Sequence, residues 1–356
     1  MTFSLHVLGS RQGGGAERFF VRLVTALAEA GHRTEAVIPP DSWVDAQLPA
    51  EVVRHRIPMR SVHDLLARWR LHRLVRRLAP DIVQTWMGRA TRLVRLPSGQ
   101  LPVHVARLGG FYDLKGYRHA HAWVGNTSGI RDHLLAGGLP AERVFRIGNF
   151  VDPPRAVSEE ERREWQARLD LPEGAIPVLA LGRLHPNKGF DTLLRALARH
   201  PCTPPPVLIL AGSGPLESVL HALAGKLELH DQVRWTGWVD DPAPLFSIAR
   251  LFVCPSRHEP LGNVILEAWN HGLPVVSTAC DGPRELITQG RDGLLVPPDD
   301  PDALGRALCM LASDEALRQR LGEAGKARLR QAFSRERIVG EYLNLYAELK
   351  ASVGQA

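Results

Sequence analysis

Short apolar runs alternate with longer amphipathic stretches through the first half of the chain. These segments lie at residues 3–8, 16–30, 34–38, 64–78, 82–85, 103–108 and 123–126. The short runs predict buried strands, and the longer stretches, with apolar residues three or four apart, predict helices. Strands that are each followed by a helix are typical of a mostly parallel sheet.

The second half of the chain repeats this rhythm. Its apolar runs lie at residues 178–181, 207–211, 233–236, 251–254 and 274–277. A chain of 356 residues is long enough for two domains of about 150–200 residues each. We therefore predict an α/β fold of two doubly wound, Rossmann-like domains. Ligands of such sheets bind at the carboxyl ends of the strands, so we expect the site in the cleft between the domains.

The predicted domain junction is Val151-Asp152-Pro153-Pro154, because successive prolines exclude helix. This places an N-terminal domain at residues 1–152 and a C-terminal domain at residues 153–334. The final segment, 335–356, predicts a helix over residues 335–350. Apolar residues recur in it at helical spacing, namely Ile338, Tyr342, Leu345, Tyr346 and Leu349.

Hydrophobic runs and cysteine spacing indicate the cellular location and exclude some kinds of site. The chain has no uncharged apolar run of about 18 residues that could span a membrane, and its first six residues lack the basic start of a secretory signal. We therefore expect a cytoplasmic protein. Cys202, Cys254, Cys280 and Cys309 have no close pair in the sequence, which predicts buried thiols and neither a zinc site nor a disulfide framework.

The N-terminal half is the basic half. Its first 152 residues carry 21 Arg and Lys against 12 Asp and Glu. The densest part, 68–77, has helical spacing, and Leu65, Leu66, Trp69 and Leu78 are predicted to face inward. A basic helix face indicates either contact with an anionic membrane or an acidic acceptor, or else an ordinary solvated surface. Nucleic acid is disfavoured because no nucleic-acid-binding motif accompanies the charge.

Two glutamates flank a predicted helix start in the second half. Glu259 and Glu267 follow the strand-like run 251–254, and a helix that begins near Gly262 leaves its first N–H groups without intrahelical partners. Such a helix start attracts phosphate. The N–H groups concerned belong to Gly262, Asn263 and Val264. Glu259 is then expected in the loop before the helix, and Glu267 about five residues into it.

Two cations follow an earlier strand of the same domain. Gly182-Arg183 ends the run 178–181, and Lys188 stands five residues later in a loop closed by Gly189. Both cations can therefore face the same ligand. A nucleotide diphosphate gains negative charge as it leaves a sugar, so fixed cations stabilise the transition state more than the ground state.

A glycine loop, Gly13-Gly14-Gly15, opens the first helix of the N-terminal domain. Without Cβ atoms the backbone can approach a ligand closely, which makes Gly14 and Gly15 candidate ligand contacts. The spacing Gly-x-Gly-x-x-Gly is absent, so an NAD enzyme is disfavoured. Trp238, after Thr236-Gly237, either lies near a nucleobase or packs on its own domain as a turn residue.

Taken together and in order, these motifs resemble the retaining glycosyltransferases of family four, or glycosyl transferases group 1, which have the two-domain GT-B fold. The resemblance is carried by Gly13-Gly14-Gly15-Ala16-Glu17-Arg18, Gly182-Arg183-Leu184 with Lys188-Gly189, Ala211-Gly212-Ser213-Gly214-Pro215, Thr236-Gly237-Trp238-Val239, the segment from Arg257 to Glu267, Gly272-Leu273-Pro274-Val275-Val276 and Gly293-Leu294-Leu295-Val296. It is dense over residues 173–335. In the N-terminal half it is limited to the glycine loop and Gly148-Asn149-Phe150-Val151-Asp152.

The resemblance implies transfer of a sugar from a nucleotide diphosphate sugar to a saccharide or lipid-linked acceptor. A UDP-sugar is the first choice of donor, and GDP-mannose or an ADP-linked sugar is the alternative. A role in bacterial surface polysaccharide or lipopolysaccharide synthesis follows from the same likeness. It implies that Glu259 holds the donor sugar, Glu267 the ribose, and Arg183 with Lys188 the diphosphate. Further donor contacts would come from Gly14, Gly15, Trp238, Leu261, Gly262, Asn263 and Val264. The final helix would pack back on the first domain, and neither a protein nucleophile nor a cofactor is required.

The sequence departs from this family after residues 103–108. Many relatives carry a histidine in the next loop, which here reads Gly109-Gly110-Phe111-Tyr112-Asp113. His104, inside the run, is expected to pack within the sheet. The loop residues Asp113, Lys115 and Tyr117 form an alternative polar cluster that could contact the acceptor or the donor sugar.

The pair Asp300 and Asp302 matches the Asp-x-Asp pattern that holds a metal in other glycosyltransferases. A helical run begins directly after it, so we interpret the two acids as cap and first-turn residues. The sequence therefore predicts no metal site. Two other functions remain open: an epimerase of UDP-N-acetylglucosamine type with the same fold, and a catalytically inactive nucleotide-sugar-binding protein.

Overall fold

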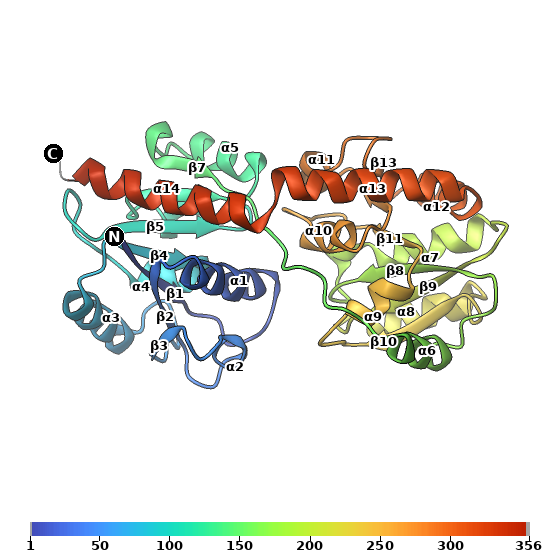
Figure 1. Cartoon of the computed structure of the whole chain (residues 1–356), viewed down its shortest axis with the longest axis horizontal. Helices are drawn as coiled ribbons and strands as arrows, with labels where there is room; N and C mark the ends of the chain where they lie inside the picture. The colour runs from blue at the N-terminus through green and yellow to red at the C-terminus, as the bar shows by residue number, and fades with distance from the viewer. Residues whose placement is uncertain (1, 354–356) are drawn as a thin grey trace. The chain divides into compact units, whose positions relative to one another are not determined.

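The computed structural model describes residues 2–353, which form two compact units (Figure 1). The chain leaves the first unit after Asp152 and returns to it at Phe333. The second unit is Pro153–Ala332. Residues 354–356, the end of the predicted C-terminal segment, lie outside the described residues.

The first unit is built on a parallel sheet, which within the described residues has seven strands in the order β3-β2-β1-β4-β5-β6-β7. The strands are β1 (Phe3–Leu8), β2 (Arg33–Ile38), β3 (Val53–Arg56), β4 (Ile82–Trp86), β5 (Val103–Leu108), β6 (Ala122–Gly125) and β7 (Val144–Arg146). The strands β1, β4, β5 and β6 are buried along their whole length because helices cover both faces of the sheet, and their sequences are largely apolar. The edge strand β3, with the sequence Val-Arg-His-Arg, is partly exposed and carries no apolar run by which it could be predicted.

Helices cover both faces of this sheet. They are α1 (Gly15–Glu29), α2 (Trp43–Gln47), α3 (Leu65–Leu78), α4 (Met87–Leu93), α5 (Ser128–Ala136) and α14 (Arg335–Val353), with short 3₁₀ turns η1 (Leu114–Gly116) and η2 (Ala141–Arg143). Leu8 and Ile82 face α1 and α14, whereas Leu5 and Val83 face α3 and α4 on the other side. Neighbouring strand residues thus belong to different cores, as the two-residue period of a strand requires.

The C-terminal helix α14 belongs to the first unit. Its five predicted apolar residues are buried, and they join the core that α1 forms over the sheet. The Tyr346 hydroxyl donates to Oε1 of Gln84 at 2.8 Å, and the Lys350 ammonium pairs with the Asp81 carboxylate at 3.0 Å. Polar contacts thus supplement the apolar packing of this helix.

Helix α3 buries a different face from the one predicted. Leu65, Leu66 and Trp69 were expected inward but are 73%, 55% and 56% exposed, and Leu78 is only partly buried. The buried stripe is instead Ala67, Leu71, Leu74 and Val75. Four-residue and three-residue steps align this second set on one side of the helix, so two apolar faces compete and only the sheet selects one.

The second unit holds another parallel sheet, with six strands among the described residues in the order β10-β9-β8-β11-β12-β13. The strands are β8 (Ile176–Leu181), β9 (Pro206–Ala211), β10 (Val233–Gly237), β11 (Leu251–Cys254), β12 (Val275–Thr278) and β13 (Leu294–Val296). The helices are α6 (Glu159–Arg168), α7 (Phe190–Arg199), α8 (Glu217–Lys226), α9 (Ala243–Ile248), α10 (Asn263–Asn270), α11 (Asp281–Leu286), α12 (Pro301–Ser313) and α13 (Glu315–Ala332), with the turn η3 (Pro186–Lys188). Leu193 of α7 and Leu308 of α12 pack with Val178, and Phe246 of α9 stacks on Phe252 of β11. No helix within residues 2–353 is long and apolar enough to cross a membrane.

The prediction of four buried thiols is wrong for two of the cysteines. Cys202 and Cys309 form a disulfide although 107 residues separate them in the sequence. Cys254 and Cys280 are free and buried. Spacing along the chain cannot reveal the bonded pair, because it depends on α7 and α12 packing side by side, which brings the two Cα atoms to 5.1 Å.

Candidate functional site

Glycines join the carboxyl ends of three neighbouring strands in the second unit. The N–H of Gly182, after β8, donates to the carbonyl of Ala211 at 3.0 Å, and the N–H of Gly212, after β9, donates to the carbonyl of Gly237 at 2.8 Å. A Cβ on Gly212 would lie 1.9 Å from the carbonyl oxygen of Gly182, and the φ of Gly212 is +149°. Only glycine allows so close an approach. The loop that begins with Gly182 and Arg183 is therefore held directly against its neighbour.

The loops after β8 and β11 are joined in the same way. The carbonyl of Asn187 in η3 accepts hydrogen bonds from the N–H groups of Arg257 at 2.8 Å and His258 at 3.2 Å. Gly189 lies so close to the second loop that a Cβ there would be 2.1 Å from the carbonyl oxygen of Pro255. The positions of Lys188 and Glu259 relative to each other are thus fixed by backbone contacts.

These contacts bring Lys188 and Glu259 together as an ion pair. The ammonium of Lys188 donates to Oε2 of Glu259, and their side chains are 26% and 13% exposed. Burial acts to lower the pKa of Lys188, but the negative charge of Glu259 and its hydrogen bond outweigh burial, so the pKa is raised. Lys188 is therefore charged at neutral pH. The sequence suggested separate roles for the two residues, and the structure makes each the counter-ion of the other.

Helix α10 begins where the sequence suggested, near Gly262. Gly262 is its N-cap, with φ of +97°, and Asn263 is the first helical residue. Glu259 lies in the loop before the helix, and Glu267 is the fifth residue of α10. The start of α11 fixes this loop, since the N–H of Gly282 donates to the carbonyl of Glu259 at 2.9 Å.

The other predicted donor-site residues differ in exposure. Leu261 is 4% exposed, whereas Asn263 and Val264 are partly buried. Arg183 is exposed, and the structure gives its guanidinium no hydrogen bond or ion pair with any of residues 2–353. Trp238 is 53% exposed and donates through Nε1 to the Asp240 carboxylate at 2.8 Å. It therefore does not pack in the core of its domain.

Arg257 is a structural residue that the sequence did not single out. Its guanidinium binds both carboxylate oxygens of Asp191 at 2.8 and 2.7 Å, the Asp299 carboxylate at 2.5 Å and the carbonyl of Pro186 at 2.8 Å. The hydrogen bonds to Asp191 raise the pKa of Arg257 further above its usual range, against the opposing effect of burial. Because Pro186 belongs to η3, Arg257 fixes the turn that carries Lys188. In the sequence, only its position two residues before Glu259 could have indicated that Arg257 belongs to the site.

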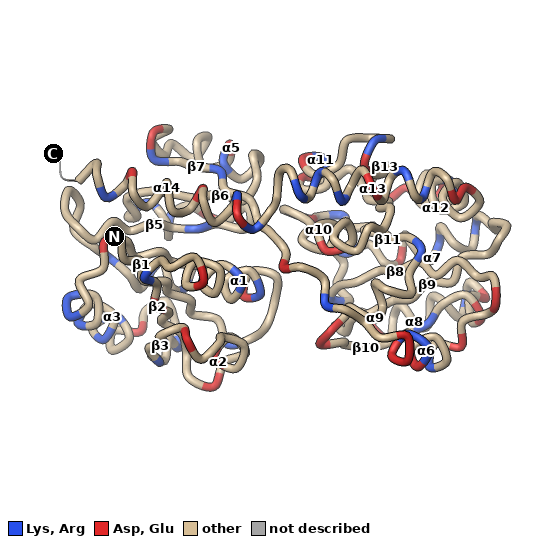
Figure 2. Tube along the Cα trace, viewed as in Figure 1, with Lys and Arg blue, Asp and Glu red and all other residues tan. Residues whose placement is uncertain are grey.

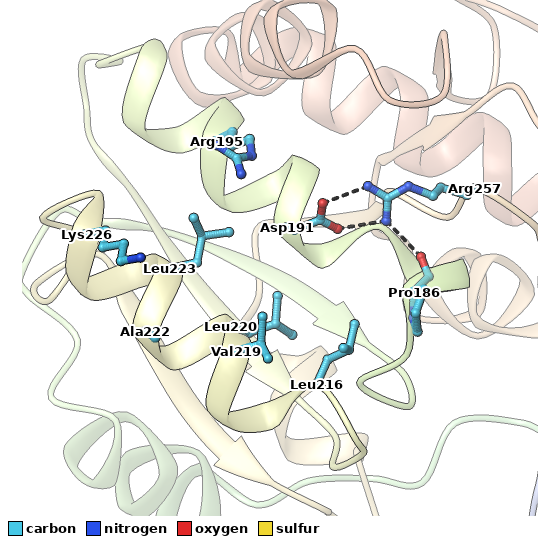
Figure 3. A pocket seen from close by; sticks show the side chains of 10 residues that line it. All are labelled: Pro186, Asp191, Arg195, Leu216, Val219, Leu220, Ala222, Leu223, Lys226 and Arg257. Carbon is cyan, nitrogen blue, oxygen red and sulfur yellow. Dashed lines mark hydrogen bonds and ion pairs between the residues drawn. The ribbon is translucent and has the colours of Figure 1, made fainter.

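A pocket of about 590 Å³ lies between α7 and α8 (Figure 3). Leu220 and Leu223 give it an apolar wall, Arg195 and Lys226 contribute cations, and the Asp191–Arg257 pair lies at one end. None of the predicted donor-site residues lines this pocket. It shares Pro186 of η3 and the Arg257 anchor with the Lys188–Glu259 region.

The glycine loop of the first unit meets protein atoms on both sides. A Cβ on Gly13 would lie 2.9 Å from the Trp43 ring, and one on Gly14 would lie 2.8 Å from Oε2 of Glu17. Gly14 is the extended N-cap of α1, and Gly15 is its first residue. Local packing alone accounts for glycine at 13 and 14. Glu17, 6% exposed, is a buried acid that the sequence did not single out.

The residues near the missing histidine take separate structural roles. His104 is fully buried, Nε2 lies 2.9 Å from the Thr85 hydroxyl, and burial holds its pKa well below the usual value. Asp113 accepts from the N–H of Lys115 at 2.9 Å as the cap of η1. Tyr117 is 2% exposed. Of these three loop residues, Asp113 and Lys115 are exposed and Tyr117 is buried.

Comparison with known proteins adds to this geometry. The sequence matches the family Glycosyl transferases group 1 over residues 161–328 and the family Glycosyltransferase Family 4 over residues 13–155. The lipopolysaccharide core biosynthesis glycosyltransferase LpsE of Rhizobium meliloti is 38% identical over 337 residues, covering 94% of this chain and 96% of that protein. LpsD of the same organism is 34% identical over 340 residues, covering 94% and 95%.

Solved structures share the fold. Anabaena Alr3699/HepE in complex with UDP and glucose superposes with a TM-score of 0.84 at 20% identity, covering 97% of this chain and 100% of that one. WaaG, a glycosyltransferase involved in lipopolysaccharide biosynthesis, gives a TM-score of 0.74 at 19% identity, covering 96% and 99%. The predicted α/β fold with two Rossmann-like domains is confirmed.

Proposed function

Because this chain belongs to the glycosyl transferases group 1 family of glycosyltransferases, we propose that it moves a sugar from a nucleotide diphosphate sugar to a saccharide or glycolipid hydroxyl with retention of configuration. The observation that carries this proposal is the Lys188–Glu259 pair, which joins the carboxyl ends of β8 and β11 directly before α10. A cation beside a helix start is suited to a diphosphate, and a carboxylate beside that cation is suited to the hydroxyls of the attached sugar.

The roles within this site follow from charge. Arg183, Lys188 and the start of α10 hold the diphosphate and stabilise the charge that develops as it leaves. Glu259 accepts hydrogen bonds from donor sugar hydroxyls, and Glu267 binds the ribose. The acceptor attacks from the face that the diphosphate leaves, and the leaving phosphate oxygen takes the acceptor proton. This reaction needs no protein nucleophile and no cofactor.

The relatives suggest the donor and the pathway. Alr3699/HepE was solved with UDP and glucose, and LpsE and LpsD are lipopolysaccharide core biosynthesis enzymes. We therefore favour a UDP-sugar donor and an acceptor in lipopolysaccharide or surface-polysaccharide synthesis.

The proposal is tested by incubating the purified protein with nucleotide sugars and glycan acceptors from a strain lacking this gene, and following the products by NMR. Transfer with the donor's anomeric configuration and release of nucleotide diphosphate supports it. Epimerised nucleotide sugar without such release would identify an epimerase instead. Donor binding without turnover of any acceptor would identify an inactive binding protein.

We expect transfer to proceed at an unchanged initial rate in excess EDTA. Asp300 caps α12 by accepting from the N–H of Ala303 at 2.8 Å, and Asp302 pairs with Arg199 and with His200, each at 3.2 Å. Both acids thus already have structural partners, and the cations near the diphosphate provide the neutralisation that a metal gives elsewhere. The double variant Asp300→Ala/Asp302→Ala should respond to EDTA as wild type does. A rate that collapses in EDTA and returns with magnesium or manganese would contradict this prediction.

We further propose that the enzyme is cytoplasmic and binds the inner face of the plasma membrane through α3. Leu65, Leu66 and Trp69 are exposed on this helix. Basic residues recur along it (Figure 2), and Arg70, Arg73, Arg76 and Arg77 are exposed. The Arg73 guanidinium lies 5.4 Å from the centre of the Trp69 ring. Apolar side chains beside cations suit the boundary between anionic headgroups and acyl chains.

Replacing Leu65 and Trp69 with serine should lower affinity for phosphatidylglycerol-containing vesicles about tenfold or more, because two large apolar side chains no longer insert. Replacing Arg73 and Arg77 with alanine should weaken binding to anionic vesicles only. The binding free energy should fall by about 1 kcal/mol for each cation removed. Flotation with vesicles measures both effects. The matched controls are Val219→Ser, exposed on α8, and Arg163→Ala, exposed on α6. Equal losses in the control variants would argue against α3 as the contact.

A further inference from the structure

The first unit contains a buried arginine at the carboxyl end of β5. Arg107 is 3% exposed. Its Nε donates to the Tyr342 hydroxyl at 3.0 Å, and Nη2 donates to Oδ1 of Asn149. The Phe19 and Trp86 rings lie with their centres 4.6 Å from the guanidinium carbon. Two neutral oxygens and two aromatic rings thus hold the cation.

This environment leaves the charge of Arg107 uncompensated. Buried arginines are normally paired with a carboxylate, because a lone buried charge is costly. Across residues 2–353 the structure gives Arg107 no ion pair, and its hydrogen bonds involve only Nε and Nη2. Nη1 is left with donor capacity and no protein acceptor. A buried cation with an unused donor favours binding of an anion.

A glycine leaves room beside this donor. A Cβ on Gly109 would lie 3.6 Å from Nη1 of Arg107 and 3.7 Å from Nδ2 of Asn126. The guanidinium and the Asn126 amide therefore flank the same point. Leu108 and Gly125 are register partners at the ends of the adjacent strands β5 and β6, which explains why the residues that follow them meet.

The Asn126 amide is an independent indication of a ligand. Asn126 is 5% exposed, and its Oδ1 is buried without a hydrogen-bond partner in the described chain. An unsatisfied buried amide oxygen costs free energy unless a ligand or water donates to it. A hydroxyl beside the anionic group of a ligand would supply this donor.

The Tyr112 hydroxyl is a further polar group on the loop that follows Gly109. A Cβ on Gly110 would lie 3.5 Å from the Tyr112 hydroxyl. Burial raises the pKa of Tyr112. The positive charge of Arg107 acts to lower this pKa, and the negative charge of Glu17 acts to raise it. The Tyr112 hydroxyl can donate to a ligand.

We propose that Arg107 and Asn126, with the space left by Gly109, form a subsite for an oxyanion, carboxylate or phosphate, on the acceptor saccharide. The assignment to the acceptor rests on the proposed function, in which the second unit binds the donor. The carboxyl ends of parallel strands are the usual ligand-binding edge of such a sheet. Arg107 supplies the charge, and Asn126 accepts from a neighbouring hydroxyl.

The test measures binding of methyl glucuronoside, glucose 6-phosphate and methyl glucoside by saturation-transfer NMR and calorimetry. Excess UDP is present so that the sugar phosphate does not report on the diphosphate region of the second unit. Gly109→Ala fills the space with a methyl group at ordinary contact distance and without a left-handed φ. Asn126→Asp keeps the shape and adds a negative charge. The matched control is Gly340→Ala, whose Cβ would meet no atom within 4 Å.

An acidic sugar should bind wild type and Gly340→Ala about tenfold or more tighter than methyl glucoside, as expected for a charge-assisted contact. Both Gly109→Ala and Asn126→Asp should abolish that preference while UDP affinity is unchanged. Whichever of the two acids binds more tightly identifies carboxylate or phosphate as the recognised group. Equal binding of acidic and neutral sugars, or wild-type binding by Gly109→Ala, would overturn the proposal. Acid-sugar binding in a protein that transfers no sugar would refute the proposed function and leave this subsite standing.

Discussion

Lys188→Ala is expected to lower kcat/KM for sugar transfer about 10- to 100-fold and to weaken binding of the free nucleotide diphosphate, because one charge-assisted contact to phosphate is lost. Backbone contacts hold Lys188 beside Glu259 before any donor binds, so the ammonium needs little reorganisation to meet the diphosphate. Calorimetry with the nucleotide diphosphate and initial-rate kinetics measure the two effects.

Lys226→Ala provides the control, since Lys226 is an exposed lysine of the same unit. Removing Lys188 also leaves the Glu259 carboxylate, 13% exposed, without its cation. The double variant Lys188→Met/Glu259→Gln removes both charges and separates lost stability from lost binding. Unchanged affinity together with an unchanged rate in Lys188→Ala would exclude this residue from the donor site.

The two glutamates are expected to respond differently to substitution. Glu259→Gln should lower the transfer rate about 10- to 100-fold while sparing affinity for the free nucleotide diphosphate, because it removes a charged acceptor for sugar hydroxyls. Glu267→Gln should weaken that affinity itself, because its proposed partner is the ribose. The positions before and within α10 support this division.

The ion pair with Lys188 adds a pH dependence to the result expected for Glu259→Gln. Glu259 raises the pKa of Lys188 against the lowering effect of burial, so Glu259→Gln should shift that pKa downward. The affinity of this variant for the free nucleotide diphosphate should then fall as pH rises through the lowered pKa of Lys188, because a neutral amine no longer attracts phosphate. Calorimetry over a pH series measures this, with Glu217→Gln, exposed on α8, as the control. Equal loss of nucleotide diphosphate binding in Glu259→Gln and Glu267→Gln would contradict the assigned roles.

Much of the local architecture was predictable from short stretches of sequence. The apolar runs identified most strands of both sheets, because strands buried on both faces are rich in apolar residues. The cap at Asp300 and the inner face of α14 were also predictable. Capping involves residues within one helical turn, and the inner face follows from helical spacing.

Contacts between distant segments decided the rest. Helix α3 has two candidate apolar faces, and only packing on the sheet buries Leu71 and exposes Trp69. The Cys202–Cys309 disulfide depends on α7 lying against α12. Spacing along the chain carries no information on either outcome, because both are set by which surfaces meet after folding.

The candidate site divides in the same way. The sequence by itself placed the candidate donor-site residues after strand ends and around a helix start, since strand, loop and helix starts are encoded locally. Only the tertiary structure decided that Glu259 neutralises Lys188 and that Arg107 is buried without a carboxylate. Charge compensation depends on which groups share a low-dielectric environment. For these residues the partners come from segments that follow separate strands or, with Tyr342, from the far end of the chain.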